Sequence, residues 1–501
     1  MSRRITWATA GATTLALLWL AFGMTRAGQP LVALGVLSFG LIAVYVYASA
    51  TTLAWKYLFP GVAGMLVFVA FPLLYTMQIG FTNYSSSHLL TEQRAREYLL
   101  DQFEVDEASL APFAVHGSGS GSTLHIVLEG EGGAKLVSPP LRVGQPPAGP
   151  VTMVPGAALP AQPLPLRGVI ALRPLLTNLK LALPDGRVLS YAGLREYGVI
   201  RPLWRAEADG ALTHLSSGAP FRPNRDQGWF EAAGGETVQP GFKVGIGVAN
   251  YSRMLLDADF RGPFVRIFVW TVVFAALTVL FSTALGMTLA VLLNWEALRF
   301  RTLYRTLLFL PYAVPGFISI LVFKGLFNQN FGEINAILDA LFGLRPAWFA
   351  DPLLAKAMLL IVNTWLGYPY IMVLCTGLIK AIPGDLYEAS ALAGAKPLTN
   401  FFRITAPLIA KPLAPLLISA FAFNFNNFVL IALLTDGRPD FLSTKLPAGT
   451  TDILVSYTYR IAFTDSGQNF GLAAAISTLI FVMVALMSML QLKAMSAQEK
   501  R

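Results

Sequence analysis

The chain has 501 residues, of which 55% are hydrophobic and 13% charged, and its formal net charge is +9. A composition this apolar excludes an ordinary soluble globular protein and is typical of a protein embedded in a membrane. Lysines and arginines at the ends of membrane spans explain the positive charge better than a nucleic-acid partner does. The single cysteine, Cys375, excludes an internal disulfide.

Three apolar runs without charged residues open the chain, at Ile5–Thr25, Ala27–Trp55 and Tyr57 to about Gly80. Each is long enough for the roughly 20 residues that cross a bilayer. Two arginines precede the first run, as in a signal peptide, but the run ends without a clear small-residue cleavage site. We therefore expect a retained first span, and three transmembrane helices within residues 1–80.

Residues 81–262 are polar and long enough to form a separate domain. The sequence predicts strands at Thr123–Leu128 and at Arg187–Tyr191, the second after a Pro184-Asp185-Gly186 turn. The Pro/Gly-rich segment Pro139–Pro165 predicts a loop or extended linker. The spacing of the four histidines matches no metal-binding pattern. We expect a β-rich insert without a metal site.

Five further charge-free runs follow, which gives eight predicted transmembrane helices and an all-α polytopic membrane protein apart from the insert. They are Ile267–Trp295, Thr306–Phe323, Ala357–Ile379, Pro412–Thr435 and Ser466–Leu492. An even number of spans puts both termini on one side of the membrane. If both are cytoplasmic, the inner segments carry clearly more Lys and Arg than the short outer ones, which is the usual bias. Residues 382–411 then face the cytoplasm.

Polar and aromatic side chains interrupt three of these spans and gather on single helical faces. Amides donate and accept hydrogen bonds, and aromatic rings pack against the apolar faces of sugars, so an uncharged lining of this kind suits a neutral polyol. The same side chains would also serve as hydrogen-bonding contacts between spans, and composition leaves both interpretations open. The residues are Tyr312, Asn363, Leu366, Gly367, Tyr370, Phe423, Asn424 and Asn427.

Residues 382–411 predict a structured loop rather than a plain connection. Asp385 followed by Glu388 is a capping-box-like helix start, Gly394 ends that helix, and Pro397 suits the first turn of a second one. The loop presents apolar side chains beside Lys396 and Arg403. An exposed apolar patch predicts a docking site for a partner protein, the alternative being an amphipathic linker on the membrane surface.

The same loop resembles the EAA loop of ABC importer membrane subunits, in Glu388-Ala389-Ser390, Gly394 and Ile404-Thr405-Ala406-Pro407. The segments NTWLGYPY (363–370), AIPGDLYEASA (381–391) and FAFNFNNFVLI (421–431) are similar to the MalF-type permease, the larger membrane subunit of bacterial maltose/maltodextrin ABC importers. The similarity extends over nearly the whole chain and is weakest across residues 100–240. It implies that the loop couples to an ATPase through Glu388, Ala389, Ser390, Gly394, Phe401, Phe402 and Pro407.

The resemblance also implies the rest of the assembly. The insert would face the periplasm, between helices 3 and 4, and contact a periplasmic maltose-binding protein. Residues 263–501 would form the permease core, paired with a second membrane subunit as a heterodimer in the Gram-negative inner membrane, above a homodimeric ABC ATPase. The eight polar and aromatic residues named above would line a maltose or maltodextrin site reached by alternating access. Gly316 and Ala420 stand where serines are expected, which leaves the finer sugar preference open.

The chain has no G-x-x-x-x-G-K-[ST] nucleotide-binding stretch and no Ser/His/acid arrangement in its spans. We expect no enzymatic activity and no bound cofactor, so that ATP and magnesium act on the partner ATPase. Three alternatives remain at this stage. They are an importer of another neutral substrate such as trehalose, a membrane receptor that docks a signalling protein at residues 382–411, and an ion-coupled carrier. The carrier would need an acidic residue within a span, and the eight runs contain none.

Overall fold

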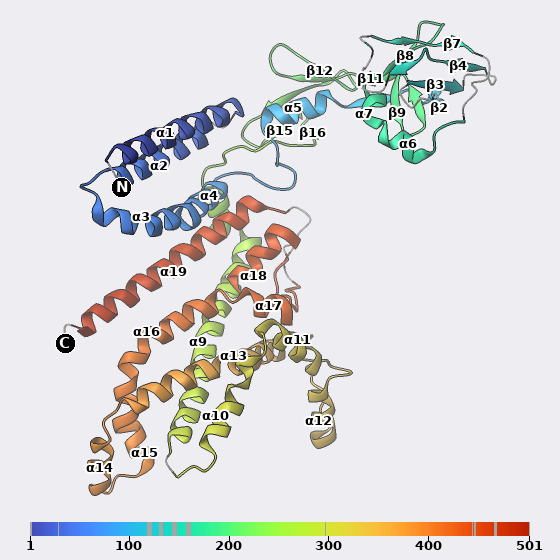
Figure 1. Ribbon diagram of the computed structural model, residues 1–501. Coiled ribbons are helices and arrows are strands. Elements are labelled where there is room, and N and C mark those ends of the chain that lie inside the picture. The colour runs from blue at the N-terminus through green and yellow to red at the C-terminus, as the bar shows by residue number, and fades with distance from the viewer. Residues whose placement is uncertain are drawn as a thin grey trace. The chain divides into compact units, whose positions relative to one another are not determined.

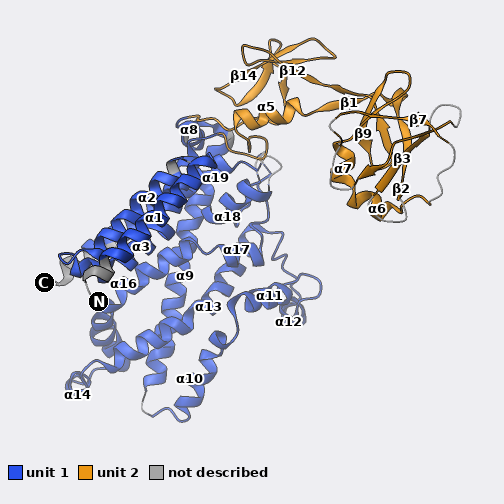
Figure 2. Ribbon diagram, turned by 45° about the horizontal axis from the view of Figure 1, so that its top comes forward, with its two compact units in different colours: residues 1–82, 247–501 blue, residues 83–246 orange. Residues whose placement is uncertain are grey.

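A computed structural model of the chain describes residues 3–28, 30–117, 123–129, 134–142, 147, 149–156, 162–295, 297–442, 444, 447–464 and 468–499. The chain forms two compact units (Figure 2). The first comprises Met1–Thr82 and Gly247–Arg501, and the second comprises Asn83–Ile246. The second unit is thus inserted into the sequence of the first.

The first unit is mainly helical (Figure 1). Its helices are α1 (Arg3–Arg26), α2 (Pro30–Ala48), α3 (Leu53–Met65), α4 (Phe71–Gly80), α8 (Ala249–Leu256), α9 (Ala258–Asn294), α10 (Arg301–Phe309), α11 (Gly316–Leu326), α12 (Glu333–Phe342), α13 (Pro352–Lys380), α14 (Asp385–Leu392), α15 (Pro397–Asn400), α16 (Ala406–Phe425), α17 (Phe428–Leu434), α18 (Leu454–Tyr459) and α19 (Phe470–Glu499). Wider π-helical turns at Leu66–Ala70, Phe401–Thr405 and Arg460–Thr464 continue neighbouring helices.

Among the described residues, six helices are long and apolar enough to cross a membrane. A seventh candidate is the pair Arg301–Ala313 and Gly316–Leu326, which is bent by 91°. The bend lies between Pro311 and Pro315, where the missing proline N–H groups interrupt helical hydrogen bonding. The second predicted run yields a shorter apolar helix, Val32–Ala48. The structure therefore supports the prediction of a helical protein with several membrane spans, but not the exact number of eight.

Helices α9 and α13 pack closely along their length, and a glycine permits the approach. A Cβ atom added to Gly286 of α9 would lie 2.9 Å from the Ile371 Cβ, the Met372 nitrogen and the Tyr368 oxygen of α13. Two of these are backbone atoms that cannot move aside, so any larger residue would push the helices apart. At the start of α13, the Asp351 carboxylate accepts hydrogen bonds from two backbone N–H groups of the first turn.

The predicted span Pro412–Thr435 is wrong as a single helix. The chain instead forms α16 and α17, separated at Asn426 and Asn427. The Asn427 side chain caps α17 by accepting a hydrogen bond from the Leu430 N–H, at 3.4 Å. Asparagine competes in this way with backbone hydrogen bonding, and so it ends one helix and starts another.

The second unit is β-rich, as predicted. Its elements are α5 (Glu92–Leu100), β1 (Phe103–Val105), β2 (Ala111–Gly117), β3 (Thr123–Glu129), β4 (Lys135–Val137), β5 (Leu141–Arg142), β6 (Val151–Thr152), β7 (Val154–Pro155), α6 (Leu166–Ala171), α7 (Arg173–Thr177), β8 (Lys180–Ala182), β9 (Val188–Gly193), β10 (Glu196–Gly198), β11 (Ile200–Pro202), β12 (Trp204–Ala206), β13 (Leu212–His214), β14 (Pro220–Asn224), β15 (Trp229–Ala232) and β16 (Thr237–Val238).

Within the described residues, one sheet has the strand order β6-β8-β9-β10-β2-β3-β4-β7, with β5 paired to β3, and a second sheet runs β12-β13-β14-β15-β16. Strands β3 and β9 confirm the two predicted strands, and Gly186 lies in the turn between β8 and β9, at a φ of +88°. The segment Pro139–Pro165 was predicted as loop or linker, but it contains the short strands β5, β6 and β7. Its residues 143–146, 148 and 157–161 lie outside the described part.

The two larger sheets of the second unit each have their own apolar core. Val115, Ile126, Leu128 and Tyr197 are buried in the core of the larger sheet. A different set, which includes Leu99 of α5, Leu212 and Phe230, is buried with the five-stranded sheet. Helix α5 begins at Thr91, whose hydroxyl accepts a hydrogen bond from the Arg94 N–H.

Candidate functional site

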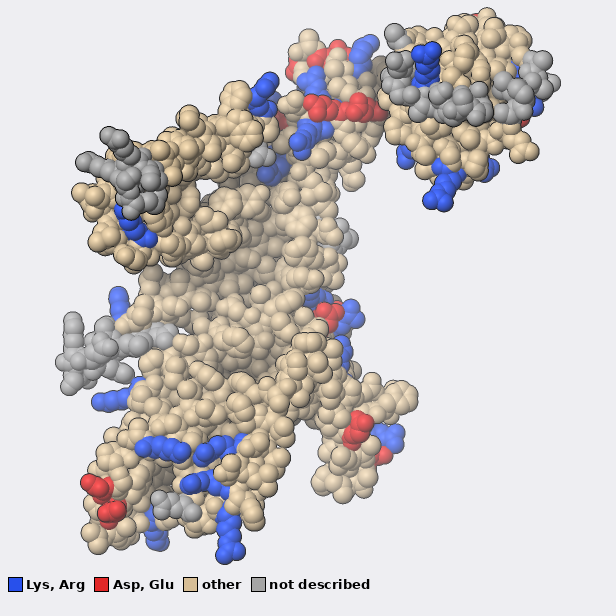
Figure 3. Space-filling model, viewed as in Figure 1, with Lys and Arg blue, Asp and Glu red and all other residues tan. Residues whose placement is uncertain are grey.

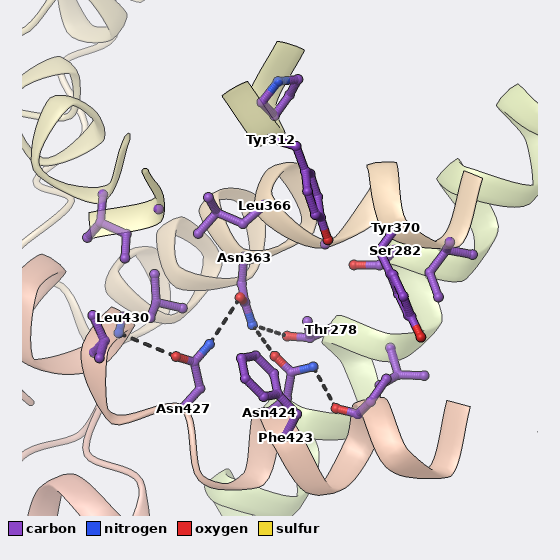
Figure 4. A pocket seen from close by; sticks show the side chains of 18 of the residues that line it. Thr278, Ser282, Tyr312, Asn363, Leu366, Tyr370, Phe423, Asn424, Asn427 and Leu430 are labelled. Atoms are coloured by element: carbon purple, nitrogen blue, oxygen red, sulfur yellow. Dashed lines mark hydrogen bonds between the residues drawn. The ribbon is translucent and has the colours of Figure 1, made fainter. Parts of the chain in front are cut away.

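A cavity of about 640 Å³ lies within the first unit (Figure 4). It is bounded by α9, α11, α13, α16, α17 and the turn Leu310–Ala313. All eight polar and aromatic residues singled out in the sequence line it: Tyr312, Asn363, Leu366, Gly367, Tyr370, Phe423, Asn424 and Asn427. A cavity of this size is sufficient for a small organic molecule.

Three asparagine side chains in the cavity wall form one hydrogen-bonded group, which we call the asparagine cluster: Asn363, Asn424 and Asn427. The Asn363 Nδ2 donates to the Asn424 Oδ1, at 2.8 Å, and to the Thr278 Oγ1, at 3.1 Å. The Asn427 Nδ2 donates to the Asn363 Oδ1, at 3.2 Å (Figure 4). The sequence left open whether these amides join helices or line a binding site. In the structure they join helices and also face a cavity.

The aromatic residues predicted from the sequence, Tyr312, Tyr370 and Phe423, come from three different elements and project around the same space (Figure 4). Tyr312 lies on the turn before α11 and stacks on Phe309 with ring centroids 5.2 Å apart. The end of α10 is held in place by Tyr368, whose hydroxyl donates to the Leu308 oxygen, at 2.8 Å. Phe423 is 71% exposed, so its ring is free to pack against a ligand.

Helix α9 adds two hydroxyl groups to the cavity, Thr278 and Ser282, which the sequence analysis missed. The Ser282 Oγ is buried and has no hydrogen-bond partner within the described residues, and a Cβ added to Gly367 would lie 2.7 Å from it. In the sequence, the only signal was two hydroxyls four residues apart in an apolar run, which is also common in helices that pack without a ligand.

The two positions that depart from the family pattern, Gly316 and Ala420, also line the cavity. A Cβ at Gly316 would meet no atom within 4 Å. The cavity lining includes no charged side chain among the described residues. An anionic ligand would call for Arg or Lys, so a lining without either favours a neutral molecule with many hydroxyl groups.

The loop 382–411 forms α14 and α15, as predicted, but without the predicted capping box. Gly384 precedes α14 in a helical conformation, and the structure shows no side-chain cap there. Asp385 and Glu388 instead lie in the first turn, where negative charge is favourable next to the helix dipole. Gly394 ends the helix with a φ of +76°, and Pro397 starts α15, both as predicted.

Most of the residues assigned to coupling are exposed. Glu388, Ala389, Gly394, Phe402 and Pro407 face solvent, whereas Ser390 and Phe401 are half-buried. Leu392, which is 92% exposed, and Leu398 are also uncovered. The loop therefore presents several exposed apolar side chains in the described chain. Figure 3 shows Lys and Arg gathered at the same end of the first unit, beside the two acidic residues of α14. This mixture of apolar and charged groups is typical of a protein-docking surface.

Comparisons with known proteins agree with this geometry. Residues 90–247 match the family model of the MalF P2 domain of the maltose transport system permease protein, and residues 282–495 match that of the binding-protein-dependent transport system inner membrane component. The "Maltose/maltodextrin transport system permease protein MalF" of Klebsiella aerogenes is 48% identical over 98% of this chain and 97% of its own length.

The protein of the same name from Escherichia coli strain K12 is also 48% identical, over 98% of this chain and 97% of its own length. A solved bacterial alginate ABC transporter has 21% identity over 49% of this chain and 81% of its own, with a TM-score of 0.43, which is too low to bear on this fold. From the full-length identity to the MalF proteins, this chain belongs to the MalF family of permease subunits of ABC import systems and is a transporter subunit rather than an enzyme.

Proposed function

We propose that this chain carries maltose and maltodextrins across the inner membrane of a Gram-negative bacterium, as one half of a heterodimeric pore with eight spans and both termini in the cytoplasm. A periplasmic binding protein delivers the sugar, and a separate dimeric ATPase, with magnesium, hydrolyses ATP. The observation that carries this proposal is the uncharged cavity lined by amides, hydroxyls and aromatic rings. The full-length identity to maltose/maltodextrin permeases supports the choice of sugar.

The asparagine cluster suits a ligand that enters and leaves. Its amides bond to one another, so each of them already has a partner within the protein. A sugar hydroxyl that replaces an amide partner exchanges one neutral hydrogen bond for another, with only a small net change in free energy. Tyr370 and Phe423 supply ring faces for the apolar side of a pyranose.

Energy enters through the loop 382–411 in this proposal. Its exposed apolar side chains dock on the ATPase, and Glu388 offers a carboxylate for a charge-assisted hydrogen bond to a basic residue there. Closure of the ATPase dimer around ATP moves the loop and opens the cavity outward, and hydrolysis returns it to the inward-open state.

The proposal is tested by reconstituting the chain in vesicles with its second membrane subunit, ATPase and binding protein. ATP hydrolysis should rise on addition of maltose-loaded binding protein, and Glu388→Lys should abolish this rise in a complex that still assembles. Tyr370→Ala and Asn424→Ala should lower maltose uptake, and uptake that ignores both changes would refute the site. Failure to recruit any ATPase would favour the receptor interpretation instead.

A different neutral sugar is the second candidate. It is favoured by Gly316 and Ala420, which leave the cavity two hydroxyl groups poorer than the family pattern that the sequence resembles. Stimulation of the ATPase by trehalose-loaded but not maltose-loaded binding protein would favour this candidate.

A further inference from the structure

The loop 382–411, which we call the coupling loop, is attached differently at its two ends: the near end follows α13 and the far end leads into α16. At the far end, the Tyr387 hydroxyl of α14 lies 2.9 Å from the Thr405 Oγ1, immediately before α16. The Ser390 hydroxyl of α14 donates to the Asn400 Oδ1, at 2.7 Å. Thr405 is buried, and Tyr387 and Asn400 are half-buried, so these bonds are partly shielded from water. Helix α14 is thus fastened by side chains to the segment that leads into α16.

The near end, toward α13, has no such side-chain bonds among the described residues 380–411. Helix α13 ends at Lys380, and a short turn leads to Asp385. Hydrogen bonds in the turn are local and made by the backbone, such as Ile382 N–H to the Ile379 oxygen, at 3.2 Å. Ile382 packs against the apolar core, but no side-chain hydrogen bond joins α14 to α13. This turn can flex while the side-chain bonds at the far end remain intact.

The fastened end leads directly to the cavity. From Pro397 the chain continues through a π-helical turn into α16, which forms one apolar helical stretch up to Phe425. Phe423 and Asn424 lie in the last turn of α16 and line the cavity, and the helix stops at the Asn426–Asn427 break. Helix α16 continues through Pro412 and Pro415, so a displacement of α14 that is passed to α16 reaches the asparagine cluster within one helix.

We propose that Tyr387 is a positioning residue which fastens the coupling loop to α16, so that the loop moves with α16 and Phe423 and Asn424 are displaced relative to Asn363 on α13. This inference rests on the proposed function, in which the loop docks on an ATPase. Tyr387 and Thr405 act through α16 and touch neither the sugar nor, in this proposal, ATP. The Asn426–Asn427 break is the hinge.

The first experiment measures sugar molecules transported per ATP hydrolysed by the reconstituted complex. Tyr387→Phe keeps the ring and removes the hydroxyl, and Thr405→Val keeps the shape and removes the partner. Loss of one partly buried hydrogen bond should lower the transport ratio by about fivefold in either variant. The double variant should be no worse than each single one, because all three lack the same bond. Additive losses, or an unchanged ratio in both single variants, would overturn the inference.

Tyr304→Phe is the matched control, because Tyr304 lies on α10 and its hydroxyl makes no hydrogen bond within the described residues. It should leave the ratio unchanged. The wild-type complex separates the two proposals. If it does not import maltose with ATP, the proposed function fails; if it does and Tyr387→Phe couples normally, only the present inference fails.

A distance measurement keeps the inference testable even if Tyr387→Phe does not assemble. Spin labels are placed at three exposed positions of the otherwise unchanged complex: Leu392 on α14, Ala410 on α16 and Lys380 at the end of α13. Addition of ATP should leave the 392–410 distance unchanged and alter the 392–380 distance. The reverse pattern would mean that the loop moves with α13, and it would overturn the inference.

Discussion

Helix α17 lies between two polar clusters of opposite chemistry. At its start, the asparagine cluster is neutral, joins α13, α16 and α17, and faces a cavity. Beyond its end, Arg460 donates to the Asp452 Oδ2, at 2.8 Å, and to the Asp440 Oδ1, at 2.7 Å. Asp452 is fully buried and also accepts from the Gly449 N–H and the Ser456 hydroxyl. We call these three charged residues the ion cluster.

This difference shows which cluster can exchange its hydrogen-bond partners for those of a ligand. Breaking a buried ion pair leaves a charge in a low-dielectric surrounding, which is costly, whereas neutral amides exchange one hydrogen-bond partner for another at small net change. Burial raises the pKa of Asp452 to about 6, while Arg460 beside it opposes that shift. We therefore assign the ion cluster to holding the segment between α17 and α19 in shape, and the asparagine cluster to binding.

The largest expected effect is on the ion cluster. Arg460→Met leaves Asp452 buried and unpaired, so it should lower the free energy of unfolding by about 3–5 kcal/mol. The loss should be smaller at pH 5 than at pH 8. An unpaired buried carboxyl has a raised pKa, so its protonated form is compatible with folding, and stability is lost as the pH rises through that pKa.

Denaturation of the purified chain in detergent at both pH values measures this effect. Arg438→Met is the control, because Arg438 is 67% exposed and its nearest carboxylate oxygen, on Asp436, is 3.9 Å away. It should change stability by less than about 1 kcal/mol. If both variants lost the same free energy of unfolding, the buried ion pair would be no more important for stability than the exposed one, and the prediction would be wrong.

The second prediction concerns the asparagine cluster. Asn363→Ala removes the amide that bonds to both other members, so maltose uptake by the reconstituted importer should fall about tenfold or more. Stability should change far less than in Arg460→Met, because no charge is stranded. Asn294→Ala is the matched control, since the Asn294 amide donates to the Ala290 oxygen of its own helix, at 2.8 Å, and does not line the cavity. A similar loss in the control would show that these amides matter only for packing.

A third, smaller effect would sharpen the assignment of the cavity. Gly316→Ser adds a hydroxyl to the lining where a Cβ meets no atom within 4 Å. It should leave stability unchanged and shift the ratio of maltose to trehalose uptake by about fivefold, the value of one hydrogen bond. Gly325→Ser lies on the same helix, has the same open space and does not line the cavity. A shift of equal size there would argue against a ligand at Gly316.

The smallest effect concerns a third kind of buried polar group, a neutral histidine in the second unit. The His88 ring lies 4.3 Å from the Trp229 ring, and its Nδ1 is 2.9 Å from the Ser85 Oγ. Its buried Nε2 has no hydrogen-bond partner in the part of the chain that the structure describes. Burial lowers the pKa of His88. The folded state then binds its proton less readily than the unfolded one, so stability is complete above pH 6.5 and is lost as the pH falls through the lowered value.

Hydrogen exchange of residues 228–242 in the full protein measures this dependence after correction for the intrinsic rate. Protection should decrease from pH 7.5 to 5.5, and His88→Asn should flatten the change. His214→Asn, in the same unit, should not affect it. A wild-type segment whose corrected protection is independent of pH would contradict the prediction.

Much of the site followed from the sequence because its signals are local. Apolar runs located most of the membrane helices. Helical spacing put Asn363, Leu366, Gly367 and Tyr370 on one face of a long helix, and all four line the cavity. Gly394 and Pro397 marked the end of one loop helix and the start of the next. In each case the deciding interaction lies within a few residues.

Tertiary structure decided what depends on neighbouring elements. Thr278 and Ser282 reach the cavity because α9 crosses α13 closely at Gly286, and an apolar run says nothing about which face that crossing presents. The asparagine cluster needs α13, α16 and α17 together, and its capping bond splits a run that looks continuous. The capping box failed because the backbone before α14 was already helical. The Tyr387–Thr405 bond spans two helices and a bend, so only the fold brings its two hydroxyls together.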